Sequence, residues 1–204
     1  MGRTNLTITS EVHMKKNNLL LILVILLVFS CCILLGQYVL KGCFFWDCVP
    51  ERSFHVRDWE IPMALLPAES FTDHISAPTD RGNELEEGTQ TVYIDQGIAV
   101  YIIDRFPRIN AAVAEFDHDK RNMMDRNTGE KWQVPSDLTF SSTTADDVYI
   151  ACGYWSNRYR CQITARYQEY VVFLNADIND KMTFARFEKI LFYLDEQISS
   201  RLYP

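Results

Sequence analysis

The longest apolar stretch of the chain runs from Leu19 to Leu40 and contains no charged residue. At about 1.5 Å rise per residue, a helix of this length spans roughly 33 Å, which matches the hydrocarbon thickness of a bilayer. We therefore expect residues 1–18 to form a short cytoplasmic N-terminus and residues 19–40 to form a single transmembrane anchor. The compartment of the rest of the chain follows from this anchor.

The same stretch has a second interpretation. A basic segment followed by Leu19–Phe29 is typical of a signal peptide, and Val28–Cys31 resembles a bacterial lipobox. Phe29 is bulky where lipoprotein signals favour a small residue, and the residues after Cys31 stay apolar. A lipid-anchored lipoprotein that begins at Cys31 is therefore the alternative to a retained helix. Both interpretations attach the remaining chain to a membrane.

Beyond residue 88 the apolar positions first follow strand patterns. Residues 91–94 and 98–106 are β-branched and aromatic runs joined by a turn at Gly97, which predicts a hairpin. Residues 134–140 and 167–174 are further strand candidates. Each of these runs is too short and too rich in β-branched residues for an amphipathic helix.

Two segments show helical spacing instead. Pro107 opens the first, whose apolar residues recur every three or four positions until Asn127–Gly129. Thr183 caps the second, near the end of the chain. The apolar stripe of this last segment comprises Phe184, Phe187, Ile190, Leu191, Leu194 and Ile198. Such a stripe predicts an amphipathic helix that covers a sheet.

Strands followed by a helix, without regular βαβ alternation, predict an α+β domain with an antiparallel sheet covered by helices. We place this globular domain at residues 89–204, after a juxtamembrane stalk and loop at residues 41–88. The pattern of residues 167–174 followed by an amphipathic helix resembles the end of several small α+β export domains, including the PsbP-like sandwich. This resemblance contains no diagnostic motif, so no functional residue is carried over.

The segment around Ser156 and Asn157 predicts a second hairpin. A two-residue turn there makes Trp155 oppose Arg158 and makes Cys152 oppose Cys161. The cysteines then occupy a non-hydrogen-bonded pair, where Cα atoms approach to roughly 4.5–5.5 Å. We expect a disulfide at this position. Buried free thiols are the alternative.

Cysteine pairing also bears on the orientation of the chain. Residues 41–204 contain Cys43 and Cys48 as a second close pair, and paired cysteines favour an oxidising compartment. Lys and Arg are balanced on the two sides of the apolar stretch, so the positive-inside rule does not decide. We therefore expect an extracytoplasmic domain on a single-pass cell-membrane protein, with disulfides at Cys152–Cys161 and at Cys43 and Cys48.

Charge excludes one class of partner. Residues 1–40 hold three of the 20 Lys+Arg and one of the 27 Asp+Glu, so residues 41–204 carry 17 against 26, a net charge of −9. Phosphate backbones and anionic lipid heads repel such a domain, so we expect no nucleic-acid partner.

Catalytic patterns are absent from the sequence. The four histidines at positions 13, 55, 74 and 118 belong to no metal-binding motif. Asp117, His118 and Asp119 are consecutive on a predicted helix, so their side chains point in different directions and cannot converge on one ion. Phosphate-binding and nucleophile-elbow glycine motifs are missing as well. We therefore predict no enzyme, no metal and no cofactor.

What remains is a membrane-tethered accessory or protein-interaction domain that binds a membrane-protein partner. The expected contact residues are Trp155, Arg158, Arg160 and Arg166, because Trp and Arg are enriched at interface hot spots and this face is basic on an acidic domain. The competing interpretation is that a helix covers this face and its acids pair with the arginines. A sensor or small-ligand-binding domain is the alternative function, followed by an enzyme of unrecognised type.

Overall fold

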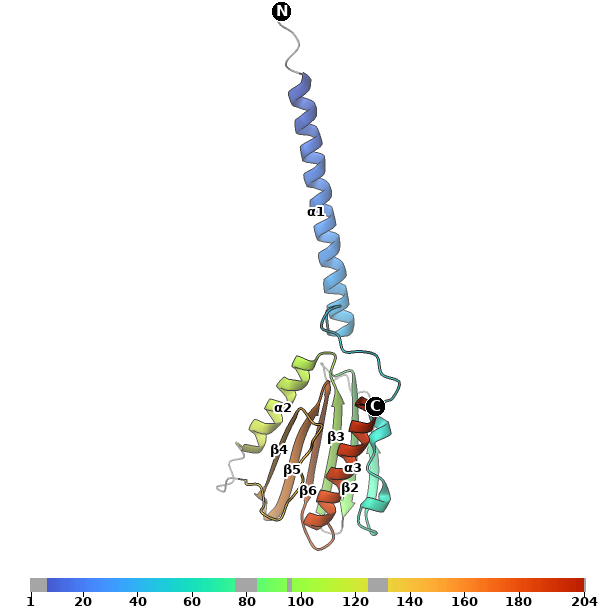
Figure 1. The fold of residues 1–204 in the computed structure, drawn as a ribbon, viewed down its shortest axis with the longest axis vertical. Coiled ribbons are helices and arrows are strands. Elements are labelled where there is room, and N and C mark those ends of the chain that lie inside the picture. Colours follow the sequence, from blue (N-terminus) through green and yellow to red (C-terminus); the bar gives the residue numbers. More distant parts are fainter. Residues whose placement is uncertain (1–6, 76–83, 95–96, 125–131, 204) are drawn as a thin grey trace, which may run out of the picture. The chain divides into compact units, whose positions relative to one another are not determined.

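The computed structural model describes residues 7–75, 84–94, 97–124 and 132–203. The chain divides into two compact units, Met1–Asp47 and Cys48–Pro204 (Figure 1). Each unit is described by itself below.

The first unit is dominated by one long helix, α1 (Thr7–Lys41). Its segment Leu19–Lys41 is long and apolar enough to cross a membrane. Gly42 follows the helix with φ 68°, and its N–H donates to the Tyr38 carbonyl. A glycine in this left-handed conformation is a common helix terminator. The prediction of one N-terminal apolar helix is therefore confirmed.

The second unit is built on one antiparallel sheet of six strands in the order β1-β2-β3-β6-β5-β4. The strands are β1 (Phe71–Ile75), β2 (Glu86–Ile94), β3 (Gly97–Arg105), β4 (Asp147–Trp155), β5 (Arg158–Tyr167) and β6 (Tyr170–Asp177). Helix α2 (Ile109–Met124) connects toward β4, and α3 (Phe184–Leu202) follows β6. The predicted α+β class with an antiparallel sheet and a C-terminal helix is confirmed.

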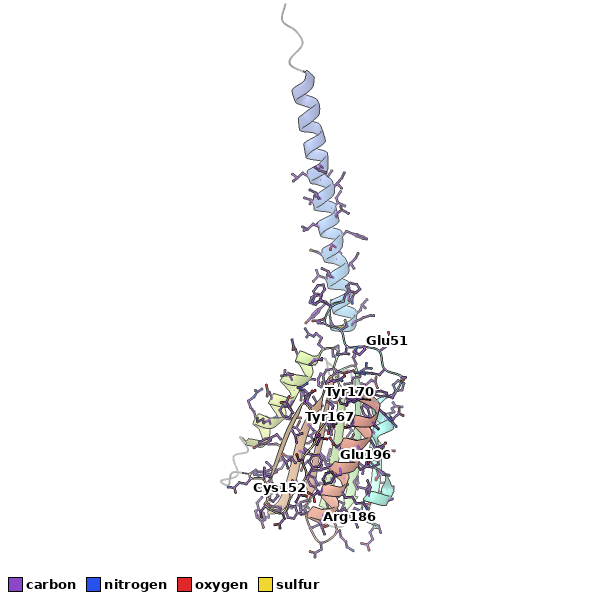
Figure 2. All side chains as sticks on the ribbon, in the orientation of Figure 1. Glu51, Cys152, Tyr167, Tyr170, Arg186 and Glu196 are labelled. Carbon is purple, nitrogen blue, oxygen red and sulfur yellow. A yellow bond between two sulfur atoms is a disulfide. The ribbon has the colours of Figure 1, made fainter. Side chains whose placement is uncertain are left out.

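The main core lies between α3 and one face of the sheet. Thr183 accepts a hydrogen bond from the Arg186 N–H and so caps α3, as its sequence predicts. The buried stripe of α3 packs on inward residues of β2, β3, β5 and β6, such as Tyr101 and Leu174. Figure 2 shows Arg186 and Cys152 toward one end of this unit and Tyr167 and Tyr170 toward the other.

Helix α2 packs on the opposite face of the sheet, against β4, β5 and β6. A small second cluster forms there from Phe106, Ala112 and Val171. Elsewhere on this side of the sheet, the Trp132 indole lies so close to Gly153 of β4 that a Cβ atom at this position would overlap the ring. Both faces of the sheet are therefore covered over β4, β5 and β6.

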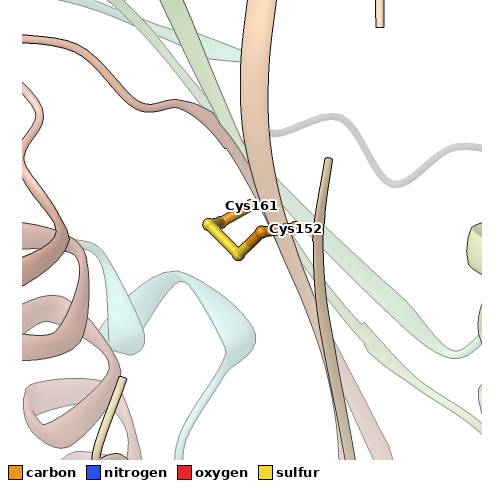
Figure 3. Close-up of a disulfide and its surroundings, with 2 residues drawn as sticks. All are labelled: Cys152 and Cys161. Carbon is orange, nitrogen blue, oxygen red and sulfur yellow. A yellow bond between two sulfur atoms is a disulfide. The ribbon is translucent and has the colours of Figure 1, made fainter. Parts of the chain in front are cut away.

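The predicted β4–β5 hairpin is confirmed in register. Ser156 and Asn157 form its turn with φ of 51° and 63°, and Cys152 opposes Cys161 with their Cα atoms 4.1 Å apart. The backbone of Cys152 exchanges two hydrogen bonds with Gln133 on its outer side. Because the backbone groups of Cys152 point outward, the cysteine pair is the non-hydrogen-bonded one. Figure 3 shows the disulfide on the side of the strands that faces α3.

Of the other four cysteines, two are disulfide-bonded and two are free thiols. Cys43 and Cys48 are disulfide-bonded, and Cys31 and Cys32 of α1 carry free thiols. Two pairs beyond the apolar helix agree with the predicted disulfides.

Residues 48–75, interpreted above as a stalk, pack within the second unit. The short helix η1 (Val56–Trp59) lies on β2 and β3, and η2 (Met63–Leu65) lies beside α3. The Trp59 indole is fully buried edge-on against Tyr170. The expected loop at residues 76–89 falls partly outside the described residues, and Glu86 already belongs to β2. The strand expected at residues 134–140 does not form. The preceding residue, Gln133, makes an isolated bridge to Cys152, and Pro135 offers no N–H to extend it.

Candidate functional site

Three of the four expected contact residues lie together at the tip of the β4–β5 hairpin. Trp155 ends β4, Arg158 begins β5, and the Arg160 guanidinium carbon lies 5.0 Å from the centre of a Trp155 ring. This distance is within the range of a cation–π interaction. We call Trp155, Arg158 and Arg160 the hairpin patch.

Asp177 of β6 supplies the counter-charge of the hairpin patch. Its carboxylate lies 3.0 Å from Arg158 Nη1 and also accepts a hydrogen bond from Arg160 Nε. The carboxylate is buried, whereas the Arg158 side chain is 50% exposed. Two guanidinium groups on one carboxylate leave one positive charge, which Arg158 presents to solvent beside the Trp155 ring.

Arg166 does not join the hairpin patch. It lies eight residues along β5 from Arg158, roughly 26 Å away at the rise of a strand. Its guanidinium binds Asp146 and Asp147 at 2.9 and 2.7 Å. These acids come from the start of β4, so they are neither the acids of a covering helix nor part of the hairpin tip. Arg166 therefore fastens the far ends of β4 and β5 together.

A set of polar groups missed by the sequence interpretation lies between the sheet and α2. Gln162 and Thr164 of β5 are fully buried there, and Thr164 Oγ1 donates a hydrogen bond of 3.3 Å to Asp119 of α2. Both polar side-chain atoms of Gln162 are buried without a hydrogen-bond partner, as is Oδ1 of Asp104 on β3. Period-two alternation along β5 puts Gln162 and Thr164 on the same face as Arg160 and Arg166, but only the position of α2 shows that these two residues are buried.

The electrostatics of this polar set are unfavourable for ionised carboxyl groups. Burial, together with the nearby carboxylates of Glu87, Glu84, Glu115 and Asp119, raises the pKa of Asp104 to about 8. Burial, together with Glu115, also raises the pKa of Asp119 to about 6. These two carboxyl groups therefore hold protons more tightly than solvent-exposed ones do.

A buried network of ion pairs joins the segment after Cys48 to the sheet. Arg52 grips Glu169 with two hydrogen bonds of 2.8 and 2.9 Å, and Glu169 is 1% exposed. Arg105 binds Glu86 at 3.0 Å and donates to the Pro50 carbonyl. Such a network costs desolvation energy but fixes geometry when every charge is paired. It holds residues 50–56 onto the β3 and β6 end of the sheet.

Beside η1 the surface is hollowed. One hollow of about 250 Å³ is lined by Val56, Gly88, Gln90, Tyr101 and Ile103 on its apolar side and by Arg57 and Glu60 at its charged side. The hydroxyl of Tyr101 is buried without a hydrogen-bond partner, and burial raises its pKa well above the usual range. Sequence alternation could not predict this hollow, because it forms between β2 and a segment interpreted as a stalk.

The described histidine side chains contact no nucleophile. His55 Nδ1 lies 3.3 Å from Glu86, and His118 Nε2 lies 2.9 Å from the Asn122 amide. Neither is hydrogen-bonded to a serine, threonine or cysteine among the residues described. The absence of enzymatic activity stays a prediction.

Comparison with known proteins leaves the function to be argued from this geometry. No family model matches the chain, and no curated protein matches it.

Proposed function

We propose that this chain is a single-pass membrane protein whose C-terminal domain lies outside the cytoplasm and binds a protein partner without catalysing a reaction. The apolar segment Leu19–Lys41 supports the membrane anchor. The disulfide Cys152–Cys161 supports an oxidising compartment for the domain. Tethering to a membrane raises the effective concentration of a domain near other membrane proteins, which suits an accessory subunit.

The observation that carries the proposal is the hairpin patch. Its aromatic ring and guanidinium groups stand on a two-residue turn, and the disulfide Cys152–Cys161 fastens the strands three residues further back. A side chain that is already ordered loses little conformational entropy on binding. Trp155 is 37% exposed and Arg158 is half exposed, so both present contact area to a partner. Trp and Arg are the residue types that dominate interface hot spots.

Copurification tests this function. The full chain would be extracted from its native membrane in mild detergent, and Arg158→Glu and Trp155→Ala would be compared with the wild type. We expect a partner at fixed stoichiometry with the wild type and its loss by about tenfold or more in each variant. Lys189→Glu is the matched control, because Lys189 is an exposed base on α3. Equal loss in the control variant, or loss that tracks a fall in thermal stability, would contradict the proposal.

The anchor and the orientation have their own test. A retained anchor predicts an intact N-terminal peptide on the mature protein, whereas a diacylglyceryl Cys31 terminus would show the lipoprotein alternative. Protease added to sealed, right-side-out vesicles should cleave the domain and spare α1. Protection of the whole domain would place it in the cytoplasm.

A sensor or small-ligand-binding domain is the second candidate. The hollow beside η1 favours it, because an apolar floor with one buried hydroxyl suits a small ligand with a polar end. Gly88 lies in its floor, and a Cβ there would lie 3.2 Å from Val56 and Ile103. A ligand screen by thermal shift would distinguish the candidates: Gly88→Ala should abolish a shift produced by binding in this hollow, and Arg158→Glu should not.

A further inference from the structure

Strand β3 is apolar on both of its faces. Ala99, Tyr101 and Ile103 point into the core under α3, whereas Ile98, Val100 and Ile102 alternate with them toward the opposite face. A strand with one solvated face normally carries polar residues there, and continuous apolar character is typical of strands covered on both faces. The sequence of β3 is therefore that of a strand with a cover on each side.

Among the described residues, a helix packs broadly on only one face of β3. Helix α2 packs on β4, β5 and β6, and α3 lies on the other face of the sheet. No helix among the described residues packs broadly over the α2 side of β2 and β3. Register continues the apolar surface across neighbouring strands, since Ile102 opposes Phe173 of β6 and Ile98 opposes Tyr93 of β2. Tyr93 in turn lies beside Phe71 of β1, with ring centres 6.3 Å apart.

We call these residues the open apolar face. They are Phe71, Tyr93, Ile98, Val100, Ile102 and Phe173. The two outer aromatics, Phe71 and Tyr93, are 66% and 48% exposed, and the central aliphatic residues are half-buried. Contiguous apolar surface of this kind marks interaction sites on soluble domains.

Carboxylates border the open apolar face at one end. Asp104 is the next outward residue of β3 and opposes Glu87 of β2. Glu115 and Asp119 of α2 lie close enough to Asp104 to raise its pKa, and Asp104 Oδ1 is buried without a hydrogen-bond partner. Within residues 7–75, 84–94, 97–124 and 132–203, no Lys or Arg forms an ion pair with Asp104, Glu115 or Asp119. These three carboxyl groups therefore have no Lys or Arg counter-charge among the described residues.

We propose that the open apolar face is a docking site for an amphipathic segment of a protein partner. Apolar side chains of that segment lie on Val100, Ile102 and Phe173, and its Lys or Arg residues reach Asp104, Glu115 and Asp119. Charge complementarity selects this occupant, because a cation relieves the repulsion among these carboxylates.

Peptide binding to the full chain tests this docking site. The protein would be placed in nanodiscs of zwitterionic lipid, with empty nanodiscs as the reference for lipid binding. The probe is a labelled helical peptide of about 18 residues, long enough to cover roughly 27 Å, with Leu on one face and Lys flanking it. A companion peptide carries Glu in place of Lys. We expect the Lys peptide to bind about tenfold or more tightly than the Glu peptide.

Matched variants locate the binding. Val100→Ser with Ile102→Ser should weaken binding of the Lys peptide about tenfold, whereas Val134→Ser, at an exposed valine elsewhere, should not. Asp104→Asn with Glu115→Gln should remove most of the preference for Lys over Glu, and Glu196→Gln on exposed α3 surface should leave it intact. Equal affinity for the two peptides, or binding that survives the serine substitutions, would overturn the proposal.

A photo-crosslinker at position 100 in native membranes identifies the occupant. Crosslinks to a segment of another protein that combines apolar residues with Lys or Arg would support the docking site. Crosslinks to a second copy, or to another part of the same chain, would overturn it. Arg158→Glu tests the hairpin patch and should leave the preference for the Lys peptide in place, so this inference and the proposed function can fail separately.

Discussion

Both faces of the sheet bury polar atoms without a hydrogen-bond partner, such as the Tyr101 hydroxyl under α3 and Oδ1 of Asp104 on the α2 side, but the two buried glutamine amides differ. Under α3, the Gln90 amide binds both the N–H and the carbonyl of Ile61 at 2.8 and 2.9 Å, and Arg105 binds Glu86. On the α2 side, the Gln162 amide has no hydrogen-bond partner and Asp104 is buried beside other carboxylates.

The two faces of the sheet therefore differ in role: the α3 face mainly stabilises the domain, and the α2 side offers a surface for interaction. The α3 face buries apolar side chains from the helix and four strands, so it accounts for most of the hydrophobic stabilisation of the domain. The α2 side has a smaller apolar cluster, a buried glutamine amide without a hydrogen-bond partner and an open apolar face. Removing the unpaired polar group of Gln162 should therefore stabilise the domain, whereas substitutions in the core under α3 should destabilise it.

The largest effect should come from the α3 face. Phe187 is fully buried, so Phe187→Ala should lower the free energy of unfolding by about 3–5 kcal/mol through lost burial and a cavity. Urea unfolding of the full chain in detergent, followed by tryptophan fluorescence, measures it. Phe192→Ala is the control on the same helix, because Phe192 is 48% exposed and should lose far less. Equal losses would show that α3 does not seal the core.

The disulfide on the same face should have the next largest effect. Replacing Cys152 and Cys161 with alanine should cost about 2–3 kcal/mol, because the unfolded chain is released from a loop closed over a sequence separation of 9. The same unfolding experiment with reductant supplies the comparison. Reductant should lower the free energy of unfolding of the wild type and leave that of the double variant unchanged. A wild type that ignores the reductant would contradict a stabilising disulfide.

The α3 face is also the part that the sequence predicts well. Period-two alternation defined the inward residues of β4 and β5, and turn length alone set Cys152 against Cys161. The apolar stripe and Thr183 defined α3. These features depend on local spacing and turn geometry, which a sequence carries directly.

The features that the sequence could not predict depend on contacts between distant segments. Trp59 lies in the segment expected to be a juxtamembrane stalk, yet it packs on Tyr170 more than 100 residues later in the chain. Arg166 is already separated from the hairpin patch by eight residues of strand, but its ion pairs with Asp146 and Asp147 depend on how the start of β4 lies beside β5. Period-two alternation predicts the face of the sheet on which a residue lies. It does not predict which residues from other segments contact it there.

On the α2 side, buried Asp104 should make the free energy of unfolding depend on pH. Its folded pKa of about 8 lies above its ordinary value of 3.8, so between these pH values the folded protein holds a proton that the unfolded chain has lost. Stability therefore falls as pH rises through this window. Asp104→Asn should raise the free energy of unfolding by at least about 1 kcal/mol at pH 9 and leave it nearly unchanged at pH 4.

The control for this pH effect is Asp180→Asn, which changes an exposed carboxyl group in the loop before α3. It should leave the pH dependence of unfolding as in the wild type. A wild-type stability that stays flat between pH 5 and 9 would show that a cation already balances Asp104, and the acidic border of the open apolar face would then need no partner.

The smallest expected effect on stability comes from one chemical change, Gln to Met, made on each face of the sheet. It should stabilise the domain on the α2 side and destabilise it under α3. Gln162→Met keeps the volume of the side chain and removes two buried polar atoms without partners, so it should stabilise the domain by about 1 kcal/mol. Gln90→Met makes the same chemical change on the α3 face, where it strips the Ile61 backbone of both hydrogen bonds and should destabilise. Denaturant midpoints of the two variants measure this contrast directly. If both variants lost stability, Gln162 would have partners in solution, such as a buried water molecule, and the contrast between the two glutamines would be lost.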